Sequence, residues 1–182
     1  MKISPTKIPE VLLFEPDVYE DERGYFMETF RASDFSGLEL NLEFVQDNQS
    51  KSKIGTLRGL HYQLRFPQGK LVRVTSGQVF DVAVDIRKNS PTFGKWVGET
   101  LSSENKNQLW IPPGFAHGFL VMSESAELFY KCTEYYHAED DFSLLWNDPD
   151  LAIDWPIQSL EPILSEKDRT ANGLLKVPVY CD

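Results

Sequence analysis

Alternation of apolar and polar side chains marks one strand of this chain clearly. Residues 78–86 repeat with a period of two, which predicts a half-buried β-strand. Asp81 and Asp85 fall on one face together with Ala83. The opposite face is apolar throughout and consists of Phe80, Val82, Val84 and Ile86. We expect Ser76-Gly77 to form a hairpin turn between this strand and the one before it.

Short segments of similar character follow one another along the chain. We predict further strands at 70–75, 96–101, 108–111, 119–122 and 127–133. The 11 glycines and 11 prolines are spread from end to end, and Pro112-Pro113-Gly114 interrupts one apolar run. Helix signals are few: a short start at 33–35, and a capping box at 165–168 that Asn172-Gly173 would end. This pattern predicts an all-β fold, a double-sheet jelly roll with short peripheral helices.

Composition narrows the classes of protein that fit. At 182 residues, 41% hydrophobic and 25% charged, the chain predicts a single globular domain over 1–182. A net charge of −10 argues against nucleic acid and against an anionic membrane surface as partners. Two distant cysteines, Cys132 and Cys181, form neither a disulfide framework nor a metal clip. No signal peptide or membrane-length apolar run is seen, so we expect a cytoplasmic protein.

The basic residues are unevenly distributed. The segment 51–73 contains no acid, and its six basic residues are Lys51, Lys53, Arg58, Arg65, Lys70 and Arg73. One interpretation is an ordinary solvated face. The other is an anion site in which Arg and Lys bind a phosphate or diphosphate.

Two of the three histidines lie in motifs. His117 follows Pro113-Gly114 as Gly-x-x-His, which resembles the second motif of cupin jelly rolls. Metal-binding cupins need a His-x-His pair, whereas this chain has His61-x-Gln63, so we predict no metal. His61 and His117 are then either hydrogen-bonded core residues or groups that transfer protons, and the nearby Arg58 and Lys70 favour the second interpretation.

Three further side chains have a structural and a chemical interpretation. Tyr130 shares a strand face with Leu128 and Cys132, which is typical of core packing. Tyr136 could stack on a base or sugar, or merely cover the barrel mouth. Asp168 is the last residue of the capping box, but it could also orient His61 through the Nδ1 atom of that ring.

Taken together, the motifs resemble the dTDP-4-dehydrorhamnose 3,5-epimerase family, a branch of the cupin jelly rolls. The resemblance covers nearly the whole chain in order. Its segments are DERGYFMETF (21–30), FVQDNQSKS (44–52), LRGLHYQ (57–63), QGKLVRV (68–74), GQVFDVAVDIRKNSPTFGKWVGETLS (77–102), IPPGFAHGF (111–119), YKCTEYY (130–136), LLWNDPDLAIDWP (144–156) and LSEKD (164–168).

The resemblance implies a cofactor-free homodimer that epimerises carbons 3 and 5 of a dTDP-linked 4-keto-6-deoxy sugar, in dTDP-L-rhamnose biosynthesis for cell-surface polysaccharide. It implies that His61 is the base, Tyr130 the acid, Asp168 the carboxylate supporting the histidine, and Lys70 the cation near the keto oxygen. Tyr136 matches the aromatic that stacks on thymine. The other positions matched to nucleotide-sugar binding are Arg23, Glu28, Gln46, Asp47, Asn48, Arg58, His117 and Lys167. Asp141 stands where the family often has Glu, and we assign it no role.

Other functions remain open at this stage. The nearest is epimerisation of one carbon only, or of a related nucleotide sugar. A metal-dependent cupin oxygenase is disfavoured by Gln63. A sugar-binding jelly roll without catalysis would not need His61, Lys70 and Tyr130 together.

Overall fold

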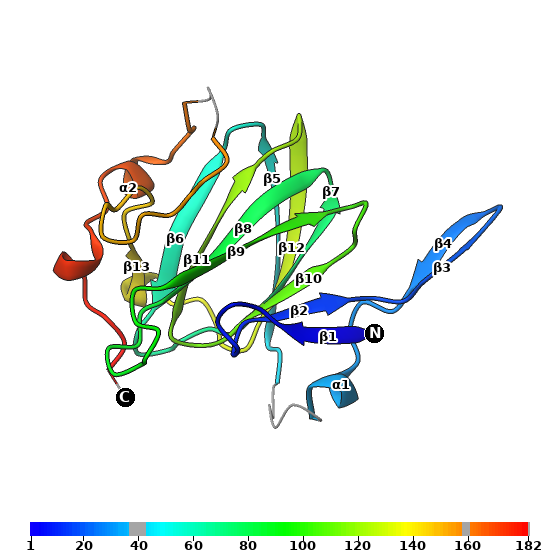
Figure 1. Cartoon of the computed structure of the whole chain (residues 1–182), viewed down its shortest axis with the longest axis horizontal. Coiled ribbons are helices and arrows are strands. Elements are labelled where there is room, and N and C mark those ends of the chain that lie inside the picture. Colours follow the sequence, from blue (N-terminus) through cyan, green and yellow to red (C-terminus); the bar gives the residue numbers. More distant parts are fainter. Residues whose placement is uncertain (37–42, 158–160, 182) are drawn as a thin grey trace.

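Two antiparallel sheets pack face to face in the computed structural model, which describes residues 1–36, 43–157 and 161–181 (Figure 1). The first sheet has the order β1 (Lys2–Pro5), β2 (Leu12–Glu15), β10 (Gln108–Ile111), β7 (Lys70–Ser76), β12 (Ser125–Cys132), β5 (Gln46–Lys53). The second has the order β13 (Asp141–Ser143), β6 (Leu57–Gln63), β11 (Phe115–Val121), β8 (Gln78–Asp85), β9 (Trp96–Ser102). The predicted all-β jelly roll is confirmed.

Helices are short and peripheral, as predicted. They are α1 (Ala32–Ser36), α2 (Glu166–Arg169) and two 3₁₀ turns, η1 (Ala138–Asp140) and η2 (Leu174–Lys176). Ser165 caps α2 by accepting a hydrogen bond from the backbone of Asp168. The helix ends at Arg169, before the predicted stop at 172–173. No helix in the described ranges is long and apolar enough to cross a membrane.

The predicted hairpin at Ser76-Gly77 is wrong. β7 pairs with β10 and β12, whereas β8 pairs with β11 and β9, so the turn carries the chain from one sheet to the other. Gly77 has φ +77°, and a Cβ there would lie 2.0 Å from the carbonyl oxygen of Ser125. The turn residues indicate a sharp reversal, but they carry no information about which strands pair afterwards.

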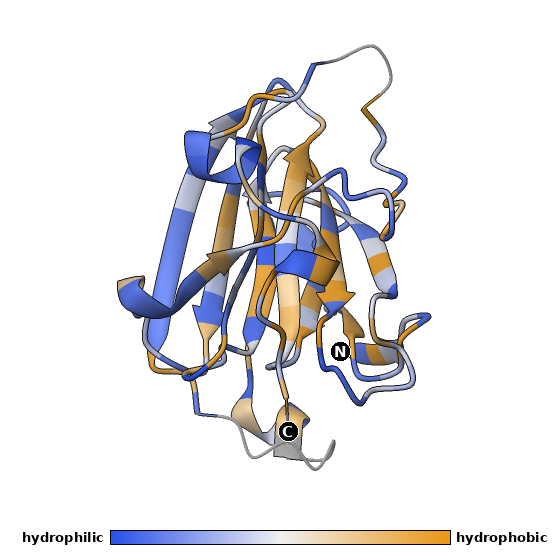
Figure 2. Ribbon diagram, turned by 90° about the vertical axis from the view of Figure 1, so that its left-hand side faces the viewer, coloured by the Kyte–Doolittle hydropathy of each residue, from blue (hydrophilic) through white to orange (hydrophobic). Residues whose placement is uncertain are grey.

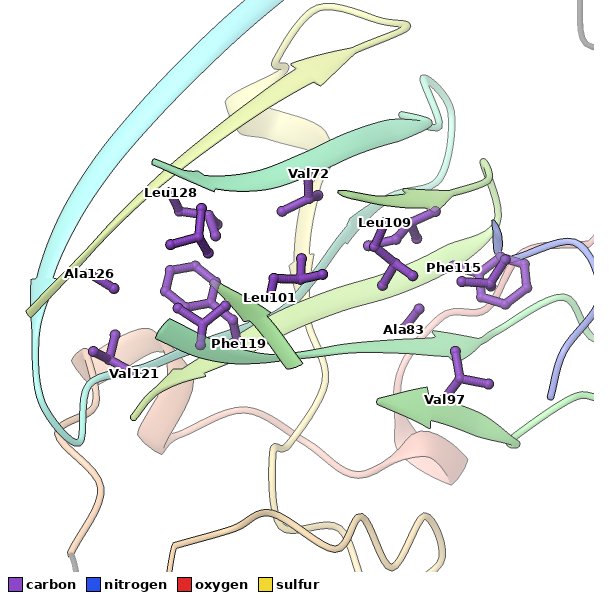
Figure 3. Close-up of a cluster of buried hydrophobic side chains, with 14 of the residues drawn as sticks. Val72, Ala83, Val97, Leu101, Leu109, Phe115, Phe119, Val121, Ala126 and Leu128 are labelled. Carbon is purple, nitrogen blue, oxygen red and sulfur yellow. The ribbon is translucent and has the colours of Figure 1, made fainter. Parts of the chain in front are cut away.

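Apolar side chains from both sheets fill the space between them (Figure 3). Val72, Leu109 and Leu128 come from the first sheet and meet Phe119 and Leu101 of the second. All five side chains are at most 6% exposed. This close packing fixes the positions of the strands, and therefore also of the polar side chains that the strands carry.

β8 is buried on both faces, which explains its run of large apolar residues. Its apolar face, including Val82 and Val84, packs under the C-terminal segment against Leu144 and Trp155. Its other face turns toward the inter-sheet space and buries Asp81 and Asp85 completely. Figure 2 shows that hydrophobic residues along the strands of the sandwich are interrupted by hydrophilic ones.

A separate hairpin, β3 (Val18–Asp21) with β4 (Gly24–Met27), projects away from the sandwich (Figure 1). Its side chains are unusually apolar for such an exposed element, with Tyr19 67% and Phe26 71% exposed. An isolated two-stranded hairpin is only marginally stable in water. A second surface is therefore expected to cover it.

Candidate active site

A cavity of about 390 Å³ opens between the two sheets. The second sheet contributes Arg58 and His61 from β6 and His117 from β11 to its lining. The first sheet contributes Lys70 from β7 and Tyr130 from β12, and Asp168 reaches in from α2. All four residues predicted to be catalytic and two of those predicted to bind substrate therefore surround one space.

Close approach of β6 and β11 places the two histidines side by side. His61 and His117 are direct register partners, and the pairing shifts by a bulge just beyond them. Gly59, at φ +122°, makes this possible because a Cβ there would lie 2.6 Å from the Cα of Gly118. A larger residue at position 59 would separate the strands that carry both imidazoles.

His61 and Asp168 form a tight dyad. His61 Nε2 lies 2.5 Å from Asp168 Oδ1, and the carboxylate is 2% exposed. Ser165 Oγ donates to Asp168 Oδ2 at 2.8 Å, so Asp168 belongs to the helix cap and supports the histidine at the same time. The predicted contact through Nδ1 is wrong: α2 approaches the ring from the Nε2 side. Nδ1 is thus the nitrogen left for a substrate.

The charge of the dyad follows from its surroundings. Burial raises the pKa of Asp168, but the hydrogen bonds from His61, Ser165 and the Gly59 backbone outweigh it and hold the pKa below its usual value. An ionised Asp168 keeps the imidazole proton on Nε2 and leaves Nδ1 able to accept a proton.

Tyr130 faces the dyad from the opposite sheet. Its ring packs against the inter-sheet core, and its hydroxyl has no hydrogen-bond partner in the described part of the chain. Burial raises the pKa of Tyr130, so the hydroxyl is protonated at neutral pH. Core packing and chemistry are therefore not alternatives here, because the ring packs and the hydroxyl reaches the cavity.

Lys70 supplies a cation to the same space. The segment 64–69 crosses from β6 in one sheet to β7 in the other, so Lys70 and His61 lie on opposite walls of the cavity. Among the described residues its amine has neither a hydrogen bond nor an ion pair. Burial lowers the pKa of Lys70, although interactions with Cys132, Asp141 and Asp81 partly oppose this. An unpartnered ammonium of this kind is available to an anionic oxygen of a ligand.

The His117 ring is held in place by a buried carboxylate. Its Nε2 lies 3.0 Å from both oxygens of Asp81, which is fully buried on β8. Arg58 is held by a hydrogen bond of 2.9 Å from Nε to Ser52 Oγ. Both side chains line the cavity, where they can contact an anion.

Some basic residues of the segment 51–73 lie where they could bind an anion, and the others lie on the surface. Arg58 and Lys70 line the cavity. The rest lie outside it: Lys51 pairs with Glu127, Arg65 with Asp140, Arg73 covers the ring of Phe129, and Lys53 is exposed.

Gln63 has a structural use that the sequence did not reveal. Its amide donates to the carbonyl oxygens of Phe66 and Tyr135, at 2.6 and 3.1 Å, and its Oε1 accepts from the backbone of His137 at 2.8 Å. This side chain fastens two loops together where a metal cupin would place a ligand. Across the described residues, no three His, Cys, Asp or Glu side chains are grouped in a way that could hold a metal ion.

Tyr136 and Lys167 lie beside the cavity and share one carboxylate. The Tyr136 hydroxyl donates to Asp141 Oδ2 at 2.9 Å, and Lys167 Nζ pairs with the same oxygen at 2.5 Å. Gln46 Oε1 accepts from the Tyr136 backbone at 2.9 Å.

The remaining predicted residues lie farther from the cavity lining. On β5, Asn48 contacts Cys132, whereas Asp47 points outward and pairs with Lys131. Arg23 lies in the projecting hairpin and pairs with Asp21; Glu28 follows that hairpin and pairs with Arg31.

Sequence reasoning missed Asp81, Ser165 and Ser50 as parts of the site. Ser50 lines the cavity two residues after Asn48 on β5, where burial alternates but polarity does not, so the residues alone did not mark it. Asp81 and Ser165 act through His117 and Asp168, and nothing local in the sequence marks those contacts.

Comparison with known proteins identifies close relatives. Residues 5–176 match the family model described as dTDP-4-dehydrorhamnose 3,5-epimerase. The chain is 58% identical over 170 residues to the dTDP-4-dehydrorhamnose 3,5-epimerase of Pseudomonas aeruginosa, covering 93% of each chain. It superposes at TM-score 0.96, with 52% identity, on a 3,5-epimerase from Legionella pneumophila in complex with dTDP-4-keto-L-rhamnose, covering 100% of this chain and 98% of that one. A 3′-monoepimerase from Streptomyces bikiniensis, in complex with dTDP-quinovose, is more distant, at TM-score 0.88, 34% identity and coverage of 94% and 87%.

Proposed function

The chain belongs to the dTDP-4-dehydrorhamnose 3,5-epimerase family, and from this we propose that it converts dTDP-4-dehydro-6-deoxy-D-glucose to dTDP-4-dehydro-L-rhamnose. The main structural support for this activity is the cavity that His61, Lys70 and Tyr130 line together. Residues 1–182 then form one epimerase domain, acting in the cytoplasm in dTDP-L-rhamnose synthesis for cell-surface polysaccharide.

The first step is removal of a proton from a carbon next to the 4-keto group. His61 Nδ1 accepts the proton, and the imidazolium is stabilised by Asp168 at 2.5 Å from Nε2. The C–H electron pair becomes part of the enolate, whose negative charge resides on the keto oxygen. Lys70 is the unpartnered cation that stabilises this oxygen, and without such a group an α-proton is not acidic enough to be removed.

The second step returns a proton to the opposite face of the same carbon. His61 belongs to β6 of the second sheet and Tyr130 to β12 of the first, so a sugar between them presents opposite faces to the two. The Tyr130 hydroxyl gives its proton to the carbon, and the enolate collapses to the ketone. Solvent then takes the extra proton from His61 and returns a proton to Tyr130, so both groups regain their starting states.

The rest of the substrate extends along the cavity toward its mouth. Arg58 and His117 suit the diphosphate because one is a guanidinium and the other an imidazole backed by a buried acid. Tyr136 would stack on thymine, with Lys167, Gln46, Asp47 and Asn48 near the nucleotide. No organic cofactor or metal takes part in these steps.

A homodimer accounts for the two predicted residues that belong to the projecting hairpin or directly follow it. Arg23 is on the exposed β3–β4 hairpin and Glu28 directly follows it, and the hairpin projects from the body of its own subunit (Figure 1). We infer that each hairpin reaches the cavity of a second copy. This would cover Tyr19 and Phe26 and bring Arg23 and Glu28 to the partner's substrate.

Subunit mixing tests this arrangement. Arg23→Ala and His61→Ala should each be impaired as pure homodimers. Mixing them after partial unfolding creates heterodimers in which one site holds both defects and the other holds none. Activity should recover to about a quarter of wild type for random pairing. No recovery, or an active monomer by light scattering, contradicts a shared site.

NMR of the reaction product tests the activity itself. Incubation with dTDP-4-dehydro-6-deoxy-D-glucose should give the L-rhamno configuration, inverted at both carbons. Inversion at carbon 3 alone would support the alternative, a single-carbon epimerase, for which the likeness to a 3′-monoepimerase is the specific observation. An unchanged substrate overturns both.

A further inference from the structure

Gln63 holds the residues on both sides of Tyr136. Its Nε2 donates to the carbonyl oxygen of Tyr135 at 3.1 Å, and its Oε1 accepts from the backbone N–H of His137 at 2.8 Å. The same Nε2 also donates to the carbonyl oxygen of Phe66 at 2.6 Å. The side chain therefore uses two donors and one acceptor. An imidazole has only two ring nitrogens, so the histidine of a metal cupin could not make the same three bonds.

The loop that carries Tyr136, residues 133–137, depends on side chains from other segments. Residues 134–136 make no backbone-to-backbone hydrogen bond within the described part of the chain. Three glutamines bond to their backbone instead: Gln68 at Glu134, Gln63 at Tyr135 and Gln46 at Tyr136. Of these, Gln63 alone makes two bonds to the loop, and its side chain is buried. Water cannot readily replace bonds lost there, whereas it can at the half-buried Gln68.

Gln63 also connects this loop to the catalytic strand. It lies two residues after His61 on β6, so both side chains point to the same face of the sheet. The Phe66 ring stacks on the His137 ring, with their centroids 4.0 Å apart. Tyr136 itself is 54% exposed and has no ring-stacking partner among the described residues. Apart from the hydrogen bond of its hydroxyl, its place relative to His61 is set by the backbone bonds around it, of which Gln63 makes two.

We propose that Gln63 is a positioning residue for the nucleoside end of the substrate: it holds the loop 133–137 so that the Tyr136 ring stands where thymine stacks on it. This rests on the proposed function, in which Tyr136 contacts the base. Gln63 acts through the loop and takes no part in proton transfer. The strand position that holds a metal ligand in other cupins serves nucleotide binding in this chain.

Gln63→Met removes all three hydrogen bonds and keeps the approximate length and volume of the side chain. A loosened loop must be ordered again when dTDP binds, so the Kd of dTDP should rise about tenfold. KM for the keto sugar should rise in parallel, with kcat within about twofold of wild type, because the groups that transfer protons are unchanged. A purely structural role would lower the melting temperature and leave the Kd of the folded protein as it is.

Gln63→Glu gives a readout that packing alone does not move. The introduced carboxylate keeps an acceptor for His137 but faces two carbonyl oxygens, which repel it. Protonation gives back one donor, and burial raises the pKa of such a carboxyl. The ratio of the variant's Kd for dTDP to that of wild type should therefore fall as pH decreases from about 8 to about 6. The ionisable neighbours Arg65, His137, Asp140 and Asp141 are present in both proteins, so the ratio removes their common effect.

Gln68→Glu is the matched control. Gln68 makes one hydrogen bond to the same loop, from Nε2 to the carbonyl oxygen of Glu134 at 2.9 Å. The substitution makes the same change of amide to carboxylate on the neighbouring segment, where water can replace the lost bond. The Kd of dTDP should stay within about twofold of wild type throughout this pH range.

A double-mutant cycle, with each Kd measured by calorimetric titration with dTDP, shows whether Gln63 acts through Tyr136. If it does, Gln63→Met should weaken binding much less in the Tyr136→Ala background than in wild type. Additive effects, or dTDP binding by Gln63→Met as tight as that of wild type, overturn the proposal. Should Gln63→Met fail to fold, Gln63→Glu decides, and a Kd ratio that does not fall with pH overturns the proposal. A wild-type protein that does not bind dTDP would instead overturn the proposed function.

Discussion

Tyr130→Phe separates the two proton transfers from each other. The substitution keeps the ring, which packs against the inter-sheet core, and removes only the hydroxyl. That hydroxyl has no hydrogen-bond partner in the described ranges, so its loss leaves no buried group unsatisfied. We therefore expect the free energy of unfolding to change by no more than about 0.5 kcal/mol.

The effect on the reaction should be far larger than the effect on folding. Loss of a general acid lowers the rate by about 10²–10⁴-fold, or roughly 3–5 kcal/mol in the barrier. Proton removal does not need Tyr130, because His61 and Lys70 remain. His61 can return a solvent-derived proton to the face from which it took one. The variant should therefore incorporate deuterium from D₂O into the substrate while forming little epimer.

The assay is NMR of the keto sugar in D₂O, with exchange and epimerisation followed in one sample and the melting temperature measured in parallel. Loss of exchange together with epimerisation would show that Tyr130 stabilises the enolate or is itself the base. Unchanged rates for both would make Tyr130 a packing residue, and the acid would then be His117 or water.

Four further outcomes follow from the dyad, the cation and the ligand set. Asp168→Asn keeps the shape of the cap, so the epimerisation rate should fall at least about 10²-fold with a melting temperature that barely moves; a normal rate would reduce Asp168 to a capping residue. Since the folded pKa of Asp168 lies below its usual value, its ionised form contributes a small stabilisation that disappears as pH falls through the folded pKa; the small difference in stability between wild type and Asp168→Asn at neutral pH should therefore vanish at low pH. Lys70→Met should slow exchange and epimerisation alike by about 10²–10³-fold without lowering the melting temperature, because it removes an unpartnered, half-buried amine. Extended chelation should leave activity intact, and a loss restored by a divalent ion would refute a metal-free mechanism.

The strands predicted most accurately are rich in apolar residues. β8 and β10 are largely buried on both faces and lie within a residue of the expected ranges. β5 was missed because it is an edge strand of polar residues, Gln46–Lys53, in which burial alternates but polarity does not. β11 begins at Phe115, four residues before the predicted start, because the site residue His117 and Gly118 interrupt its apolar pattern.

Long-range pairing is what the residues alone could not determine. The turn at Ser76-Gly77 connects different sheets, and His61 meets Asp168 across 107 residues of sequence. The site assignments came from the family resemblance, and six of the predicted residues do line one cavity. The atom of His61 that faces Asp168 depends on the side from which α2 docks, and no motif contains that information.

The central claim is that His61 removes the proton at both carbons from within this one cavity. Deuterium exchange in D₂O, compared between wild type and His61→Ala at equal protein concentration, tests it most directly. Wild type should incorporate deuterium at carbons 3 and 5, and His61→Ala should incorporate none at either, while both bind dTDP and melt at similar temperatures. Exchange by His61→Ala at either carbon would contradict the account, because a second base would then have to act there.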